Sequence, residues 1–354
     1  MKVQREGKMI EAVDLFCGAG GLTKGLEKAG INVSLGIDID PYCAYPYEAN
    51  NKAKFLLKSV EKVDASELFT KKQKGYRLLA GCAPCQPFSR YRQGIESKSD
   101  KRWKLLHEFR RLIEESLPDF VTMENVPRLR EEKVFRDFLR SLHKMGYSTS
   151  YQVVNCADYG VPQQRNRLVL LASRHGEINL ISPTHTPDKY KTVSDALKKL
   201  EPIRAGQSDE RDPLHHSASL TPINLKRIKS SKPGGTWRDW DKSLVADCHR
   251  KSSGKTYPSV YGRMRWDQPS PTITTQFYGF GNGRFGHPEQ HRAISIREGA
   301  ILQSFPKGYK FLKKGQEVEL TFLGRLIGNA VPVKLGEVIG KSIKQHIKEI
   351  KRKK

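Results

Sequence analysis

Residues 11–29 read EAVDLFCGAGGLTKGLEKA, and this stretch decides the fold class. Residues 11–16 have the apolar character of a buried strand, residues 17–21 are rich in glycine, and residues 22–29 have the spacing of a helix. A strand, a glycine turn and a helix in this order open a nucleotide-binding α/β unit, because glycines let the backbone pass close to a ligand at the amino end of the helix. The glycine spacing differs from G-x-G-x-x-G, so it does not specifically indicate a dinucleotide.

Strands and helices alternate from this stretch to about residue 172. Predicted strands cover residues 33–37, 55–57, 77–81, 119–123, 147–155 and 167–172, and helical stripes lie at 105–113 and 134–145. This alternation is typical of a doubly wound, mostly parallel α/β sheet.

The pattern changes at about residue 173. From Pro183 to Gly262 the periodicity fades and Pro, Gly, Ser, Lys and Arg dominate, which predicts a smaller, loop-rich, basic domain. Order is expected to resume near residues 272–275, and helical patterns return at 296–303, 320–327 and 333–350. We expect residues 1–173 to form the first part of the α/β domain, 174–262 the basic domain, and 263–354 a supporting segment that returns to complete the first domain.

The composition of the 354-residue chain restricts its class. With 37% hydrophobic and 29% charged residues, and no apolar run of about 18 residues, we expect a cytoplasmic protein without a membrane span or signal peptide. The net charge of +25 favours a polyanionic partner, with nucleic acid first. The alternative is a solvated, lysine-rich surface with no partner.

Residues 82–89 read CAPCQPFS and directly follow a predicted strand. Pro84 and Pro87 stiffen this loop, so Cys85 is a thiol held at a strand's carboxyl end, where open α/β sheets bind ligands. Cys85 is therefore a candidate nucleophile. Cys82 and Cys85 form one C-x-x-C without a second pair or suitably spaced histidines, so we expect no metal site. We expect Cys82 to be strand-end packing and its replacement by alanine to be tolerated.

Two carboxylates lie at the carboxyl ends of strands of the same predicted sheet. Glu124 follows the strand at 119–123, and a thiol and a carboxylate beside a nucleotide-like ligand suggest covalent catalysis with an acid partner. Asp38 lies about 20 residues after the glycine turn, where a carboxylate suits ribose hydroxyls. The alternative for Asp38 is a helix cap before Pro41, a role that suits Asp40 better.

Five motifs occur in the order and spacing of the DNA (cytosine-5) methyltransferases of prokaryotic restriction-modification systems, which this chain resembles over residues 10–345. They are DLFCGAGG at 14–21, PCQPFS at 84–89, ENV at 124–126, QQRNR at 163–167 and GNAVP at 328–332. The resemblance implies a class I S-adenosylmethionine-dependent methyltransferase with a Rossmann-like sheet and a small target recognition domain. It implies methyl transfer to carbon 5 of a cytosine flipped out of duplex DNA.

The resemblance also implies residue roles. Cys85 is then the nucleophile that adds to carbon 6, and Glu124 holds and protonates ring nitrogen 3. Arg167 contacts the base carbonyl and Arg165 supports it. The implied cofactor, S-adenosylmethionine, is held by Phe16, Gly18, Gly20, Gly21, Asp38, Ile39, Ser59, Val60, Pro84, Asn329 and Val331. The implied DNA contacts are Gln86, Ser89, Trp237, Arg238, Arg250 and Lys251.

Two positions depart from the family pattern. Ser59 stands where many members have an aspartate that binds the adenine amino group, which predicts weaker cofactor affinity. Ile39 replaces the aromatic residue found beside Asp38 in some members, and an aliphatic contact on the adenine can serve there.

Three other functions remain as alternatives. A tRNA cytosine methyltransferase of the same fold shares the Pro-Cys-Gln and Glu-Asn-Val motifs, but its Cys-Phe-Thr signature is missing here. A non-catalytic nucleic-acid-binding homologue would be expected to lose Cys85, Glu124 or the glycine turn. A thiol oxidoreductase using Cys82 and Cys85 leaves the other motifs unexplained. We expect a monomer that acts on double-stranded DNA, with a restriction endonuclease as a possible companion in the same system.

Overall fold

A computed structural model describes residues 9–70, 75–84 and 103–352 of the chain. The chain divides into unit 1, which comprises residues 1–155, 166–183 and 331–354, and unit 2, which comprises 156–165 and 184–330. This division differs from the expected boundary at residue 262, because residues 263–330 belong to unit 2. Arg263 illustrates the reason, since its guanidinium donates to the carbonyls of Ile228 and His287 within that unit.

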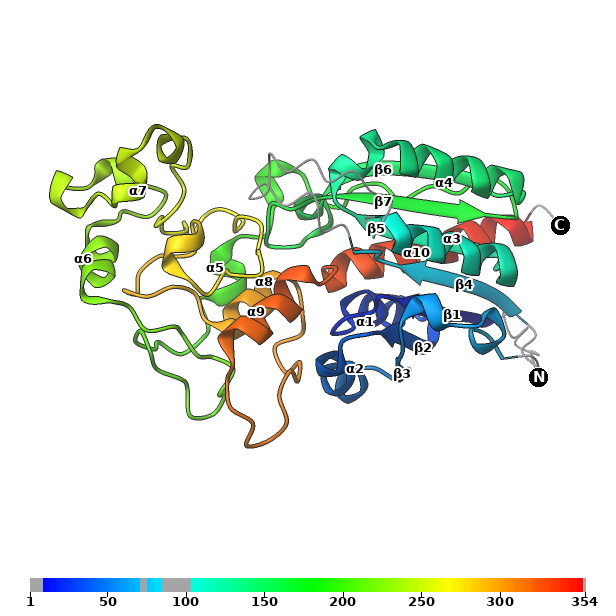
Figure 1. Cartoon of the computed structure of the whole chain (residues 1–354), viewed down its shortest axis with the longest axis horizontal. Helices are drawn as coiled ribbons and strands as arrows, with labels where there is room; N and C mark the ends of the chain where they lie inside the picture. Colours follow the sequence, from blue (N-terminus) through cyan, green and yellow to red (C-terminus); the bar gives the residue numbers. More distant parts are fainter. Residues whose placement is uncertain (1–8, 71–74, 85–102, 353–354) are drawn as a thin grey trace. The chain divides into compact units, whose positions relative to one another are not determined.

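Unit 1 is built on a seven-stranded sheet in the order β3-β2-β1-β4-β5-β7-β6 (Figure 1). The strands are β1 (Met9–Leu15), β2 (Asn32–Asp38), β3 (Lys54–Leu57), β4 (Gly75–Gly81), β5 (Phe120–Asn125), β6 (Ser148–Asn155) and β7 (Asn166–Ser173). β1 to β5 are parallel, whereas β7 is antiparallel to both β5 and β6. The predicted doubly wound, mostly parallel sheet is confirmed.

The strand order reverses at the centre of the sheet. From β1 the chain moves outward through β2 and β3, and it then returns to the other side of β1 to form β4 and β5. The carboxyl ends of β1 and β4 therefore flank a topological switch point, the place where open α/β sheets bind ligands.

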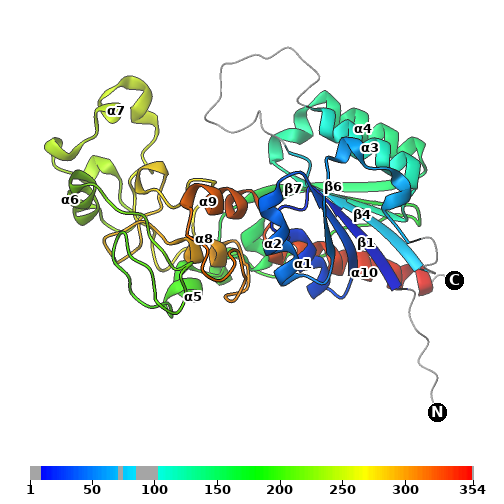
Figure 2. The same cartoon turned by 60° about the horizontal axis from the view of Figure 1, so that its bottom comes forward.

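Helices cover both faces of this sheet (Figure 2). They are α1 (Gly21–Lys28), α2 (Ala44–Asn50), α3 (Lys104–Ser116), α4 (Lys133–Lys144) and α10 (Val333–Arg352). α3 and α4 bury Phe109, Phe135 and Phe138 in the core against the sheet. On the other face α10 packs so tightly on α1 that a Cβ at Gly25 would lie 2.4 Å from the Val333 carbonyl oxygen. The last helix in the sequence thus belongs to the first structural unit.

Unit 2 contains short helices and long irregular segments. Its α-helices are α5 (Val193–Leu197), α6 (Pro222–Ser230), α7 (Asp247–Arg250), α8 (Ile296–Leu302) and α9 (Leu320–Asn329). Across residues 156–165 and 184–330, strand pairing is limited to isolated bridges such as Gln163 with Ser270, so the order expected near 272–275 is not a strand.

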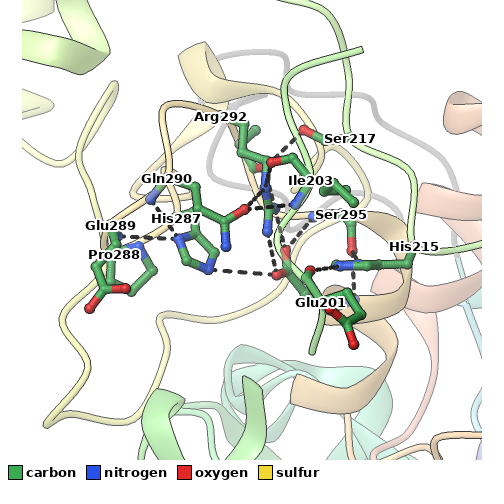
Figure 3. A network of polar contacts seen from close by, with 12 residues as sticks. Glu201, Ile203, His215, Ser217, His287, Pro288, Glu289, Gln290, Arg292 and Ser295 are labelled. Carbon is green, nitrogen blue, oxygen red and sulfur yellow. Dashed lines mark hydrogen bonds and ion pairs between the residues drawn. The ribbon is translucent and has the colours of Figure 1, made fainter. Parts of the chain in front are cut away.

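A buried polar network stabilises unit 2 (Figure 3). Arg292 is fully buried and its two terminal nitrogens donate to both carboxylate oxygens of Glu298, at 2.6 and 2.8 Å. Ser295 caps α8 through the Glu298 backbone nitrogen and also contacts His215 Nδ1 at 2.7 Å. The carboxylate of Glu298 therefore balances the Arg292 charge and completes the cap of α8.

Candidate active site

Four strand ends meet at the switch point of unit 1. The register pairs Leu15 of β1 with Gly81 of β4, and Gly81 with Met123 of β5. The glycine turn, Cys82 and Glu124 therefore leave adjacent strands at the same edge, and β2 brings Asp38 to this edge beside β1. The structure thus brings together the segments that the sequence singled out.

The turn after β1 is a tight loop with left-handed backbone at Phe16, Gly18 and Gly20, whose φ values are 58°, 52° and 86°. A side chain in this region is strained, so Phe16 is held there by its surroundings, as often happens at functional sites. The Gly18 backbone nitrogen donates to Asp38 Oδ2 at 2.9 Å. A Cβ at Gly18 would meet nothing within 4 Å, so the space above the turn is open to a ligand.

Asp38 has the chemistry of a hydroxyl-binding carboxylate. Its Oδ1 accepts from the Asp40 backbone nitrogen at 2.9 Å, so both oxygens are oriented by backbone donors and each keeps lone pairs for a ligand. Ile39, next to it, is 70% exposed, and Leu57, which pairs with Asp38 in the β2–β3 register, is 54% exposed. This exposed aliphatic surface beside Asp38 suits a flat, apolar ring.

The other predicted cofactor residues are found in different environments. Ser59 is half-buried and precedes the 3-10 helix Val60–Lys62 without capping it through its side chain. Val60 is 3% exposed and packs in the core, and its carbonyl accepts from Arg111 Nη2. Pro84 and Asn329 are exposed, and Val331 is buried.

A buried carboxyl for which the sequence predicted no role, that of Asp14, lies under the glycine turn. Asp14 is 1% exposed, and its Oδ2 accepts from Thr23 Oγ1 at 2.7 Å. Thr23 Oγ1 in turn lies 2.9 Å from the Tyr47 hydroxyl. The other carboxylate oxygen of Asp14, Oδ1, is buried and receives no hydrogen bond within the described chain. Burial raises the pKa of Asp14 to about 7.

Glu124 ends β5 as a buried carboxylate that is 3% exposed. The Cys82 thiol donates to Oε2, with sulfur and oxygen 2.9 Å apart. Arg167 Nε lies 2.9 Å from Oε1 but its N–H is not directed at that oxygen, so the contact is an ion pair without a hydrogen bond. Burial and the neighbouring Glu124 raise the pKa of Cys82 well above its ordinary value, which keeps this group a protonated thiol.

Asn125, the next residue, connects the end of β5 to the loop that follows β4. Its side-chain nitrogen donates to the Ala83 carbonyl at 3.0 Å, and its oxygen accepts from the Val126 backbone nitrogen at 2.8 Å. Asn125 therefore fixes the start of the segment that carries Cys85. Cys85, Gln86 and Ser89 themselves lie outside the described residues.

Arg165 is a buried connector within unit 2. It is 3% exposed and donates to the carbonyls of Ile273 and Gly328, at 2.8 and 3.0 Å. It thereby holds the backbone directly before Asn329. Arg167, two residues later, belongs to unit 1 and pairs with Glu124, so the two predicted arginines have different surroundings.

The predicted DNA contacts in unit 2 separate into buried and exposed groups. Trp237 is 7% exposed; its indole nitrogen donates to the Tyr257 carbonyl and its ring stacks on His249 with centroids 4.4 Å apart. Arg238, Arg250 and Lys251 are exposed. The side chain of Trp237 therefore packs inside unit 2, and the three cations are available at its surface.

Two classes of site are absent from the part of the chain that the structure describes. No group of three or more His, Cys, Asp or Glu residues is arranged to hold a metal ion there. None of the helices in those residues has the length and apolarity needed to cross a membrane.

A doubly wound sheet with a glycine turn, a buried carboxylate and an arginine at its switch point defines the class of α/β proteins that bind a nucleotide-like ligand at this edge. Residues 10–345 match the family model of the C-5 cytosine-specific DNA methylases. The chain belongs to this family and is a DNA (cytosine-5) methyltransferase.

Relatives agree with this assignment, and a solved structure has the same fold. The chain is 52% identical to the Type II methylase M.HgiDII of Herpetosiphon aurantiacus, over 96% of each chain, and 32% identical to the Type II methyltransferase M1.HphI of Haemophilus parahaemolyticus, over 94% of this chain and 86% of the relative. A crystal structure of a candidate DNA modification methyltransferase encoded within an Escherichia coli prophage has the same fold. It matches with a TM-score of 0.72 at 21% identity, over 95% of this chain and 99% of that one.

Proposed function

We propose that this chain methylates a flipped cytosine in a specific duplex sequence, as the modification enzyme of a restriction-modification system, with Cys85 as the nucleophile and Glu124 as its acid partner. The observation that carries the proposal is the buried Glu124 carboxylate at the end of β5, next to the strand that leads into the Cys85 loop. A thiolate that adds to carbon 6 makes carbon 5 nucleophilic, and negative charge develops on the ring. A proton delivered from Glu124 to ring nitrogen 3 offsets that charge.

Arg167 and the loop contacts support the same step. Arg167 faces the carboxylate across 2.9 Å, so its guanidinium can turn toward the base carbonyl while it stays beside Glu124. Asn125 holds the Ala83 carbonyl, which orients the chain two residues before Cys85. Once carbon 5 carries the methyl group, water takes the carbon 5 proton, Cys85 leaves as a thiolate, and ring nitrogen 3 returns its proton to Glu124, which restores the aromatic ring.

We propose S-adenosylmethionine as the methyl donor, because the residues at the switch point fit it. The group supplies an electrophilic methyl when bound. Asp38 offers two oriented oxygens to ribose hydroxyls, Ile39 offers an exposed aliphatic surface to the adenine, and the open space above Gly18 accommodates the methionine end. The roles of Asn329 and Val331 in binding the methionine part are inferred from the family resemblance.

The nucleophile is tested with duplex DNA that carries 5-fluorocytosine at the target. Fluorine cannot leave as a cation, so the Cys85 adduct is trapped and survives a denaturing gel. The adduct is expected with the parent enzyme and is expected to vanish in Cys85→Ser; an adduct in that variant would sink the assignment. Glu124→Gln is expected to lower turnover by about 10²–10³-fold, the usual loss of one charge-stabilising group. Near-normal turnover in Glu124→Gln would refute the acid role.

The cofactor site is tested by restoring the acid that many family members carry. Ser59→Asp is expected to tighten S-adenosylmethionine binding by about 5- to 10-fold, since a carboxylate accepts from the adenine amino group more strongly than a hydroxyl. Calorimetric titration measures the change, and Ser66→Asp in the following turn is the control for added negative charge. Equal affinities in all three proteins would show that Ser59 does not face the adenine.

A further inference from the structure

The thiol of Cys82 makes a specific contact that the sequence did not predict. Cys82 directly follows β4, and the residue before it, Gly81, pairs with Met123 of β5. Cys82 is thus placed beside Glu124 on the adjacent strand, and its sulfur reaches Oε2 at 2.9 Å. Cys82 is half-buried, and the desolvation of its sulfur together with Glu124 holds the pKa of the thiol well above its ordinary value, so the group stays protonated and donates to the carboxylate.

The two oxygens of Glu124 are therefore not equivalent. Oε2 receives the thiol hydrogen, whereas Oε1 receives no hydrogen bond within the described chain and has only the Arg167 charge beside it. Rotation of the carboxyl group would exchange these oxygens, and the thiol contact opposes that rotation. The oxygen that remains able to exchange a proton with a base is Oε1.

We infer that Cys82 is a positioning residue that fixes the carboxyl group of Glu124 through Oε2 and thereby presents Oε1 to ring nitrogen 3 of the cytosine. This inference rests on the proposed acid role of Glu124. It replaces the sequence-based expectation that Cys82 only packs at the strand end. A thiol suits the task because it is a weak donor that can orient the carboxylate through one oxygen.

Loss of the thiol is expected to slow the chemical step without weakening binding. A net hydrogen bond of ordinary strength corresponds to about 5- to 10-fold in rate. Cys82→Ala is therefore expected to lower the single-turnover rate by about that factor, with the KM for DNA and the affinity for S-adenosylmethionine unchanged. Cys82→Ser keeps a donor and is expected to recover most of the rate.

A double-mutant cycle separates positioning from packing. If Cys82 acts through Glu124, Cys82→Ala is expected to cost little further rate in a Glu124→Ala enzyme, as measured by the rate of adduct formation with 5-fluorocytosine DNA. A packing defect would instead lower the rate by the same factor in both backgrounds, and serine would give no rescue; that result would overturn the inference. Cys156→Ala, which removes a buried thiol elsewhere in the chain, is the control for cavity formation.

The same experiment distinguishes the inference from the proposal beneath it. If Glu124→Gln turns over normally, the acid role fails and the inference falls with it. If Glu124→Gln is impaired while Cys82→Ala matches the parent rate, only the positioning role is wrong. Thermal unfolding of every variant accompanies the kinetics, so that a variant that fails to fold is recognised and Cys82→Ser then decides.

Discussion

The two units of this chain satisfy their backbones by different means. In unit 1 the strands pair with one another in a continuous seven-stranded ladder, and apolar side chains from α3 and α4 fill the space against it. Unit 2 has only isolated bridges across its residues, so its irregular carbonyls need other donors. Buried arginines supply them. The difference shows that one chain can satisfy its backbone carbonyls either by pairing strands or by hydrogen bonds from side chains.

Arg263 is the clearest example of the second means. It is 3% exposed and donates to the carbonyls of Ile228, His287 and Gln290. A guanidinium presents five donors in a rigid fork, so one side chain can satisfy several carbonyls that no strand reaches. Arg165, Arg292 and Arg297 make similar buried contacts. Part of the basic charge of unit 2 is therefore structural.

The largest expected effect is the loss of a buried charge partner in unit 2. Glu298→Ala leaves Arg292 buried without its carboxylate, and breaking a buried pair in this way costs about 3–5 kcal/mol of unfolding free energy. Denaturant unfolding measures the loss, and hydrogen exchange is expected to place it in residues 200–300. Leu170→Ala in β7 is the matched change in unit 1, with the loss of protection expected in the sheet. Uniform loss of protection in both units after Glu298→Ala would contradict the comparison.

Lowering the pH is expected to weaken the contribution of the buried Glu298 and His287 groups to the stability of unit 2 and to strengthen the contribution of Asp14 to that of unit 1. Glu298, despite its burial, has its pKa lowered to about 2, chiefly by Arg292, and burial lowers the pKa of His287 to about 4. Each pKa lies below its value in the unfolded chain, so each group contributes stability that is lost as the pH falls. For His287 the loss runs from pH 6.5 toward 4, and for Glu298 from pH 4.5 toward 2. Asp14, raised from 3.8 to about 7, contributes stability that is complete below 3.8 and lost as the pH rises toward 7.

Hydrogen exchange at pH 4 and pH 7 checks these signs. Each contribution is on the order of 3 kcal/mol. At pH 4 protection is expected to fall in residues 200–300, with the peptides of β1 and α1 comparatively preserved. Asp14→Asn removes the acid-side advantage of unit 1 and is the control. Equal protection losses in the two units at pH 4 would contradict the assignment of these groups.

The same contrast explains which features the sequence could predict. Strands and amphipathic helices leave periodic patterns, so all seven strands of unit 1 and the helices beginning near Lys104, Lys133 and Val333 were predicted close to their bounds. Unit 2 has no such pattern. In the sequence, an arginine that donates to buried carbonyls cannot be distinguished from one that binds DNA. Trp237 shows one limit: the resemblance implied a DNA contact for it, and the stacking of its ring on His249 was not predicted.

The candidate site was likewise only partly predictable. Strand-end positions predicted that Glu124 and Asp38 lie at one edge of the sheet, since parallel strands bring their carboxyl ends together. The contact between Cys82 and Glu124 depends on the register of β4 against β5, which no local pattern encodes. The lack of a hydrogen bond to Asp14 Oδ1 within the described chain depends on how the folded unit buries this atom, so no local pattern predicts it either.

The smallest expected effect concerns steric fit in unit 1. Gly25→Ala places a methyl group 2.4 Å from the Val333 carbonyl oxygen and 2.5 Å from the Glu337 nitrogen, and both atoms are backbone that cannot rotate away. α10 must shift from α1, which costs about 1–3 kcal/mol, typical of overpacking. Denaturant unfolding measures the loss, and hydrogen exchange should confine it to α1 and α10. Gly308→Ala in unit 2, where a Cβ meets nothing within 4 Å, is expected to change stability little. If both variants match the parent protein, α10 is not held against α1 by this close approach, and the packing account of unit 1 loses its sharpest element.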